Sequence, residues 1–279
     1  MTGSLPMTPG RWVALVIGTP LALLVIGWTA LSAVAWAGLG SYQVNLAVPV
    51  HGRAAAVSVD EGDITVGPGP AGRLRVHGTL RYSLVRPQLR WQRSPSTIAL
   101  HSHCRVPTGL CSFAYAVTVP AGGRSEVSNA SGNVTASGLA GTVTLSTDSG
   151  DIHATRISGS ATITDHSGDI TVSSLSAGRA LIMNDSGNIT GRGVSSQVLT
   201  AQGQSGDITL VFTAVPEYVK ISSSGGDITI VVPSGNASYA ITSNASGGDY
   251  HSTVSTNDAS PHSIQVDSGG GNISIAEVS

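Results

Sequence analysis

The chain has 279 residues, of which 41% are hydrophobic, 4% aromatic and 11% charged, and 35 are glycine. Few charges, few aromatics and many small residues are typical of a repetitive all-β chain with small corners. The net charge of −2 shows no overall basic excess, and nucleic acid is not expected as a partner.

The N-terminal segment predicts a membrane anchor. Residues 1–11 form a short polar tail, and residues 12–40 contain no charge. Because about 20 apolar residues cross a bilayer, residues 12–40 predict an uncleaved transmembrane helix. The alternative is a signal peptide cleaved after Ala37, but its apolar region is usually only about 7–15 residues long. The only charge before the helix is Arg11, which places the N-terminus in the cytoplasm and the C-terminal domain outside the cell membrane.

Residues 41–124 are expected to form a membrane-proximal β cap, although Gly62-Asp63-Ile64 already matches the later repeat. The only cysteines, Cys104 and Cys111, predict a disulfide that closes a small loop in an exported segment. His101 and His103 with these thiols also offer metal-ligand atoms, but their spacing is not that of a standard zinc site. We therefore predict the disulfide and no metal.

Charge is divided unevenly along the chain. Residues 41–124 contain nine arginines and three acids, a net charge of +6, whereas residues 125–279 have a net charge of −9. The basic segment 41–124, lying beneath the acidic segment 125–279, could lie against anionic headgroups or wall polymers. The other interpretation, that these arginines are solvated strand faces, stays open.

A short phrase, Ser-Gly-Asp-Ile-Thr and its variants, recurs from residue 131 onward. The glycine that precedes Asp or Asn returns after 18, 18, 19, 19, 20, 22 and 23 residues, starting from Gly132. A near-constant period of this size indicates a stacked repeat. The corner residues are Gly132, Asn133, Gly150, Asp151, Gly168, Asp169, Gly187, Asn188, Gly206, Asp207, Gly226 and Asp227.

Apolar residues alternate with polar ones on both sides of each corner. Ala161 and Ile163 precede Gly168, and Ile170 and Val172 follow it. Such period-2 alternation predicts two short strands per repeat, each with one buried face. We therefore predict that residues 125–279 form an all-β, parallel β-helix-like β-solenoid of about 18–23-residue repeats. A two-sheet sandwich is the alternative.

Turn chemistry accounts for the two residue types that recur at each corner of the phrase. Glycine reaches the positive φ of a corner, and Asp or Asn can bond to nearby backbone amides. Calcium-binding repeats need a carboxylate at a fixed place. Asn133 and Asn188 occupy the same place as Asp151, so turn chemistry is favoured over calcium.

Catalytic residues and cofactors are not predicted. Asp165-His166-Ser167 has the residue types of a triad, but triads are assembled in space rather than by adjacency. The equivalent corner at Asp148-Ser149 lacks a histidine and serves the same turn. We interpret both segments as structural.

The repeated phrase, together with Tyr115-Ala116-Val117-Thr118-Val119-Pro120 and Leu139-Ala140-Gly141, resembles the bacterial putative-adhesin family of β-strand repeat proteins. The family is a domain of unknown function, and the resemblance covers roughly residues 50–275. It implies a β-helix-like solenoid that is often tethered to the membrane, and it brings no catalytic or ligand residues.

These observations predict a non-enzymatic, membrane-anchored, adhesin-like module that acts as a binding or scaffolding surface in the cell envelope. Its expected partners are the membrane and an envelope polymer or protein. A self-associating structural or envelope-stress sensory domain, forming a homo-oligomer, is the alternative. An enzyme that acts on polysaccharides is the remote one.

Overall fold

The computed structural model describes residues 18–29, 39–50, 52–83, 85–104 and 111–278. The chain forms two compact units. The smaller comprises Met1–Tyr42, Leu80–Pro87 and Cys104–Ser112, and within it residues 18–29 are helical. The larger comprises Gln43–Thr79, Gln88–His103 and Phe113–Ser279.

The predicted transmembrane helix lies partly outside the described residues, which omit 1–17 and 30–38. Among the residues that are described, no helix is long and apolar enough to cross a membrane. The helix at 18–29 exposes every side chain, including Leu23, Ile26 and Trp28.

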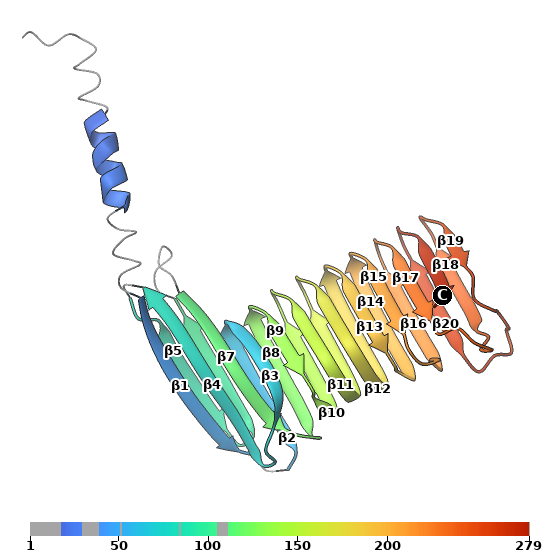
Figure 1. Cartoon of the computed structure of the whole chain (residues 1–279), viewed down its shortest axis with the longest axis horizontal. Helices are drawn as coiled ribbons and strands as arrows, with labels where there is room; N and C mark the ends of the chain where they lie inside the picture. Colours follow the sequence, from blue (N-terminus) through green and yellow to red (C-terminus); the bar gives the residue numbers. More distant parts are fainter. Residues whose placement is uncertain (1–17, 30–38, 51, 84, 105–110, 279) are drawn as a thin grey trace, which may run out of the picture. The chain divides into compact units, whose positions relative to one another are not determined.

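The larger unit is a β-solenoid-like column with two walls of parallel strands (Figure 1). Each coil runs along the first wall, turns at the glycine corner and returns along the second. In spatial order the first wall consists of β6 (Thr97–His103), β2 (Ala54–Glu61), β8 (Arg124–Ser131), β10 (Ala140–Thr147), the later part of β11 (Ile152–Asp165) and of β12 (Ile170–Ser186), β14 (Val198–Ser205), β16 (Tyr218–Ser223), β20 (Ser263–Ser268) and β18 (Ala240–Ala245).

The second wall repeats this order on the other side of the core. It consists of β7 (Cys111–Pro120), β3 (Asp63–Gly69), β9 (Val134–Ser137), the earlier parts of β11 and β12, β13 (Ile189–Val194), β15 (Ile208–Phe212), β17 (Ile228–Val232), β21 (Ile273–Glu277) and β19 (Tyr250–Ser252). At the N-terminal end of the column β4 (Arg73–Ser83) pairs with β7, β1 (Leu39–Pro49) pairs with β4, and β5 (Gln88–Ser94) pairs antiparallel with β6.

The core is a pair of apolar columns, one on each wall. Ile152, Ile170, Ile189 and Ile208 stand in register on successive coils and are at most 1% exposed. Since a fully buried Ile side chain contributes about 1.5–3 kcal/mol, this stacking is the main stabilising term of the fold. The prediction of a mostly β, solenoid-like fold is confirmed.

The two ends of the column depart from simple sequence order. The coil of β2 and β3 lies between the coils of β6–β7 and β8–β9, so part of the expected cap is itself a rung of the column. At the other end the last coil, β20 and β21, inserts between β16–β17 and β18–β19. Each insertion places a coil between two coils that do not both adjoin it in the sequence.

A second corner follows four successive strands of the second wall, namely β9, the earlier parts of β11 and β12, and β13. It is occupied by Gly138, Arg156, Ser174 and Gly193, all with φ between 52° and 69°. Because Arg156 and Ser174 are not glycine, this corner has no uniform signature in the sequence. It turns the buried Ile157 and Leu175, which pair with one another, back toward the first wall.

Candidate functional site

The glycine corner is held by a continuous ladder of side-chain hydrogen bonds. Oδ1 of each Asp or Asn except the last, Asp249, accepts a bond of 2.8–3.0 Å from the backbone N–H of its counterpart on the next coil. The ladder bond itself needs only an acceptor oxygen, which explains why Asn can replace Asp. The Nδ2 groups of Asn188 and Asn272 also donate to Asp169 and Asp227, at 3.3 and 3.1 Å. In spatial order the ladder runs through Asp63, Asn133, Asp151, Asp169, Asn188, Asp207, Asp227, Asn272 and Asp249. The glycines of the predicted corners, Gly132, Gly150, Gly168, Gly187, Gly206 and Gly226, all have positive φ.

A second, buried polar row supports the same corner from inside. Asn129 donates to the carbonyl of Gly62, Thr147 to that of Gly132 and Asn184 to that of Gly168, at 2.9–3.3 Å. The residue of this row in the coil between Thr147 and Asn184 is Asp165, which is 1% exposed. Its Oδ2 has no hydrogen-bond partner among the described residues. Burial raises the pKa of Asp165 to about 6.

Asp165, His166 and Ser167 do not form a triad. Neighbouring residues of a strand point to opposite faces, so Asp165 faces the core while His166 is exposed. His166 Nδ1 lies 3.4 Å from Asp148 and its Nε2 lies 3.9 Å from Asp185. The nitrogen that donates to Asp165 Oδ1 is the backbone N–H of Ser167. The arrangement serves the turn.

The outer face of the second wall carries a row of hydroxyl groups. Thr171, Thr190, Thr209 and Thr229 stand in register on four successive coils, and Ser274 continues the row. All five side chains are half-buried by their neighbours. The matching row of the first wall is mixed, because it consists of Thr162, Leu181, Thr200, Lys220 and Gln265.

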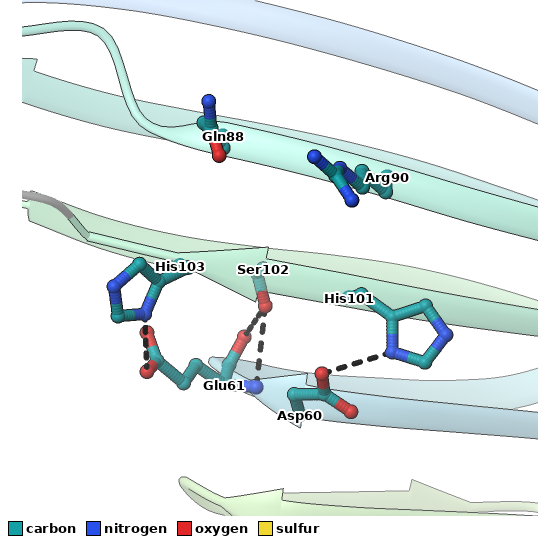
Figure 2. Close-up of a pocket in the computed structure, with 7 residues that line it drawn as sticks. All are labelled: Asp60, Glu61, Gln88, Arg90, His101, Ser102 and His103. Carbon is teal, nitrogen blue, oxygen red and sulfur yellow. Dashed lines mark hydrogen bonds and ion pairs between the residues drawn. The ribbon is translucent and has the colours of Figure 1, made fainter.

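A polar hollow of about 440 Å³ lies at the N-terminal end of the first wall. Figure 2 shows that His101 and His103 project from β6 beside two acids of β2, with Arg90 of β5 across from them. His101 Nδ1 lies 3.0 Å from Asp60 Oδ2, and His103 Nδ1 lies 3.8 Å from Glu61 Oε1. Both pairs are solvent-exposed, so each contributes at most about 1 kcal/mol to stability.

The serine of this hollow is engaged by the backbone. Ser102 Oγ donates to the carbonyl of Glu61 and accepts from its N–H, which completes the pairing where the β2–β6 ladder ends. Burial, followed by the negative charges of Glu61 and Asp60, raises the pKa of the nearby Tyr115 hydroxyl. The hollow can therefore hold a polar ligand, but Ser102 is not poised as a nucleophile.

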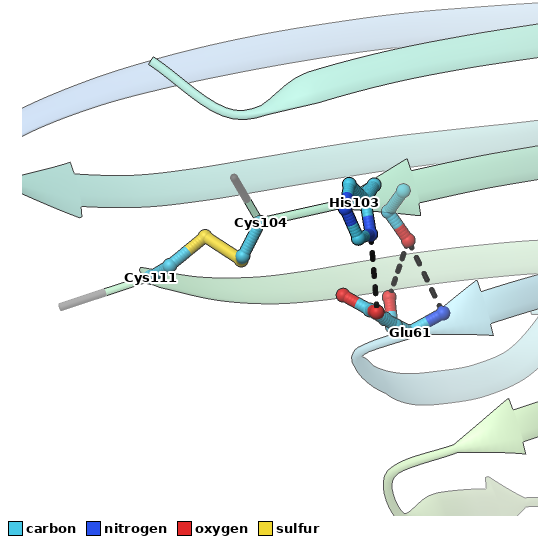
Figure 3. Close-up of a disulfide and its surroundings, with 5 residues drawn as sticks. Glu61, His103, Cys104 and Cys111 are labelled. Atoms are coloured by element: carbon cyan, nitrogen blue, oxygen red, sulfur yellow. Dashed lines mark hydrogen bonds and ion pairs between the residues drawn. A yellow bond between two sulfur atoms is a disulfide. The ribbon is translucent and has the colours of Figure 1, made fainter. Parts of the chain in front are cut away.

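The cysteines form the disulfide between Cys104 and Cys111, which joins the end of β6 to the start of β7 (Figure 3). Their sulfur atoms are consumed in this bond and are not available as metal ligands. In the described part of the chain, no group of three or more His, Cys, Asp and Glu side chains is arranged to hold a metal ion. Asp60 and Glu61 were not among the predicted site residues, since only the pairing of β2 with β6 brings them to the histidines.

The family model described as Toastrack DUF4097 matches residues 114–276, more than half of the chain. The chain belongs to the DUF4097 Toastrack family. The Toastrack match begins in β7 and runs into β21; the coil of β2 and β3 and the strand β6 lie before it. The resemblance to the putative-adhesin repeat proteins is thereby confirmed.

Three solved structures are similar to much of this chain. A putative adhesin from Bacteroides fragilis is 15% identical, with 85% of this chain and 97% of that chain covered and a TM-score of 0.48. A putative adhesin from Parabacteroides distasonis is 12% identical at the same coverage and TM-score. A putative lipid binding protein from P. distasonis is 10% identical over 86% of this chain and 97% of that chain, with a TM-score of 0.40. No curated protein matches the Toastrack chain.

Proposed function

We propose that this Toastrack protein is a non-enzymatic, adhesin-like module that is anchored in the cell membrane by residues 12–40 and binds an envelope polymer outside the cell. The observation that carries the proposal is the row Thr171, Thr190, Thr209 and Thr229 on the second wall. Successive rungs lie about 4.8 Å apart, so the row repeats one hydroxyl and one methyl group at a fixed interval. An extended polymer with its own repeat can make the same contact with each rung.

The surface offers binding chemistry rather than reaction chemistry. Ser102, the serine of the polar hollow, is bonded to backbone, and Asp165 of the triad-like segment is buried. The corner carboxylates accept hydrogen bonds from the backbone of the next coil. These groups have structural roles, which supports a binding module.

Binding to the envelope can be tested with the full chain in a mild detergent. We expect it to co-sediment with isolated cell-wall polymer, and the double variant Thr190→Glu, Thr209→Glu to bind roughly tenfold more weakly or worse, because two carboxylates replace the methyl and hydroxyl contacts. The matched control, Thr162→Glu with Thr200→Glu, puts the same charges on the first wall and should bind as the parent does. Equal binding by all three proteins would exclude the threonine row as the contact.

The anchor has a separate test. We expect the full chain to stay in the membrane fraction after alkaline carbonate washing, and a variant that lacks residues 12–40 to be released. Protease added to intact cells should digest the column while a tag placed before Met1 is protected. A mature N-terminus directly after Ala37 would instead establish cleavage, and release of the full chain by carbonate would refute anchoring.

A further inference from the structure

The column ends on two strands that are paired on one side only. Among the described strands β18 pairs only with β20, and β19 only with β21 (Figure 1). Alternate N–H and C=O groups of β18 and β19 therefore face an open edge. Native edges are usually blunted by charge, proline or a bulge. Ala240–Ala245 contains neither a charged residue nor a proline, whereas β5 at the other end exposes Arg90 and Arg93.

The apolar interior is only partly covered at this end. Tyr239 and Val254 are buried, and the segment around Thr256 bridges to Tyr239 just before β18, but the positions above β20 and β21 remain exposed. Tyr250 occupies the inward position directly above Ile273, yet Tyr250 is 43% exposed and Ile273 only 1%. Ser243 stands above Val266 in the same way and is exposed, while Val266 is 1% exposed. The terminal coil thus has the geometry of an interior rung without the neighbour that would bury it.

The corner ladder is incomplete at the same place. Asp249 is the last residue of the ladder, and its own N–H donates to Asn272 Oδ1 at 2.9 Å. Every earlier Asp or Asn of the ladder accepts a bond from the next coil, but no N–H of the described residues donates to the carboxylate of Asp249. One surface therefore carries the unpaired edges of β18 and β19, the exposed side chains of Tyr250 and Ser243, and the carboxylate of Asp249 that accepts no ladder bond.

We propose that this surface binds a second copy of the chain, joined end to end across a twofold axis. A twofold axis perpendicular to the column brings the β18 and β19 edges of two copies together in antiparallel pairs. One added strand from another protein would cover one wall and leave the interior open. A second copy covers both walls at once and buries each Tyr250 against the other column. This goes beyond polymer binding, because it joins two copies of the chain. The N-terminal ends of their columns then lie at opposite ends of a doubled column.

The backbone N–H of Ser243 offers a way to test whether two copies pair through the β18 edge or through another surface. Ala240 and Ser246 donate their N–H groups toward the β20 side, to His262 and Ser268. Alternation along a parallel strand therefore puts the N–H of Ser243 on the open edge. Ser243→Pro removes that donor and leaves the β18–β20 ladder intact, which edge strands tolerate. Ser243→Ala is the matched control, because it keeps the backbone donor.

The test is sedimentation velocity of the full chain in a mild detergent, with thermal melting to verify that each variant is folded. We expect dimers for the parent and Ser243→Ala, and for Ser243→Pro a dissociation constant roughly tenfold higher or more. Hydrogen exchange of Ala240–Ala245 should slow in the dimer. A parent that stays monomeric at the highest concentration reached would overturn the proposal. So would a dimer that Ser243→Pro leaves unchanged, since the contact would then lie elsewhere, as in residues 12–40.

Discussion

Gly168→Ala is expected to lower the free energy of unfolding by roughly 3 kcal/mol or more. Gly168 has a φ of +143°, and an added Cβ would lie 2.2 Å from the carbonyl oxygen of Gly150 on the neighbouring coil. That oxygen belongs to backbone and cannot turn away as a flexible side chain could. The two coils would have to separate, and separation breaks the adjacent ladder bond from the Asp169 N–H to Asp151.

Gly178→Ala is the matched control for this substitution. Gly178 lies on β12, the same strand that follows the Gly168 corner, and the nearest atom to its added Cβ is Gln197 Oε1 at 3.8 Å. We expect a change within about 0.5 kcal/mol. Chemical denaturation followed by circular dichroism measures both variants. Similar losses of stability in the two would mean that the corner tolerates a side chain and that the close stacking of glycines is not required.

The repeated rungs could be predicted because each carries its own complete local signal. Ile170 and Val172 follow Gly168 in the same way that Ile208 and Leu210 follow Gly206, and alternation assigns each to the core. The spatial order of the rungs at the two ends could not be predicted. The alternation of apolar and polar residues predicts that residues 54–69 and 263–277 form rungs. Because every rung has the same pattern, it does not predict which rungs pair with each other.

The polar hollow lay beyond sequence reasoning for a related reason. The alternating pair His101 and His103 was visible as a cluster, but it pointed to Cys104 as its partner. The structure places that cysteine in the disulfide and brings Asp60 and Glu61 to the histidines instead. These acids are about 40 residues away in the chain, and only the long-range pairing of β2 with β6 joins them.

Asp165→Asn is expected to raise the free energy of unfolding at pH 8 by about 2–3 kcal/mol. An ionised carboxylate is costly to bury, and burial raises the pKa of Asp165 from 3.8 to about 6. Asn184 shows the alternative one coil away, since its Nδ2 donates to the carbonyl of Gly168 at 2.9 Å. An asparagine at 165 can make the corresponding bond to the carbonyl of Gly150, and it carries no charge.

The sign of the pH dependence follows from the raised pKa. Between about pH 4 and pH 6 the folded chain keeps a proton on Asp165 that the unfolded chain has lost, so this group stabilises the fold at low pH. Its contribution is complete below about pH 4 and disappears as the pH rises through about 6. A rise in the pKa of Asp165 from 3.8 to about 6 corresponds to roughly 3 kcal/mol. The groups that act on Asp165 are the N–H donors of Ser167 and His166, the charge of Asp151 and the His166 imidazole.

Because protonated Asp165 is also neutral and has an O–H to donate, the advantage of Asp165→Asn should shrink to near zero at pH 4. The matched control is Asp169→Asn on the exposed ladder, where Oδ1 only accepts and asparagine already serves at position 188. We expect that control to change stability by less than about 0.5 kcal/mol at either pH. Urea unfolding of both variants at pH 4 and pH 8 decides the matter. A gain that is equal at the two pH values would show that the gain does not come from the titration of Asp165, and the cost assigned to its buried charge would then be wrong.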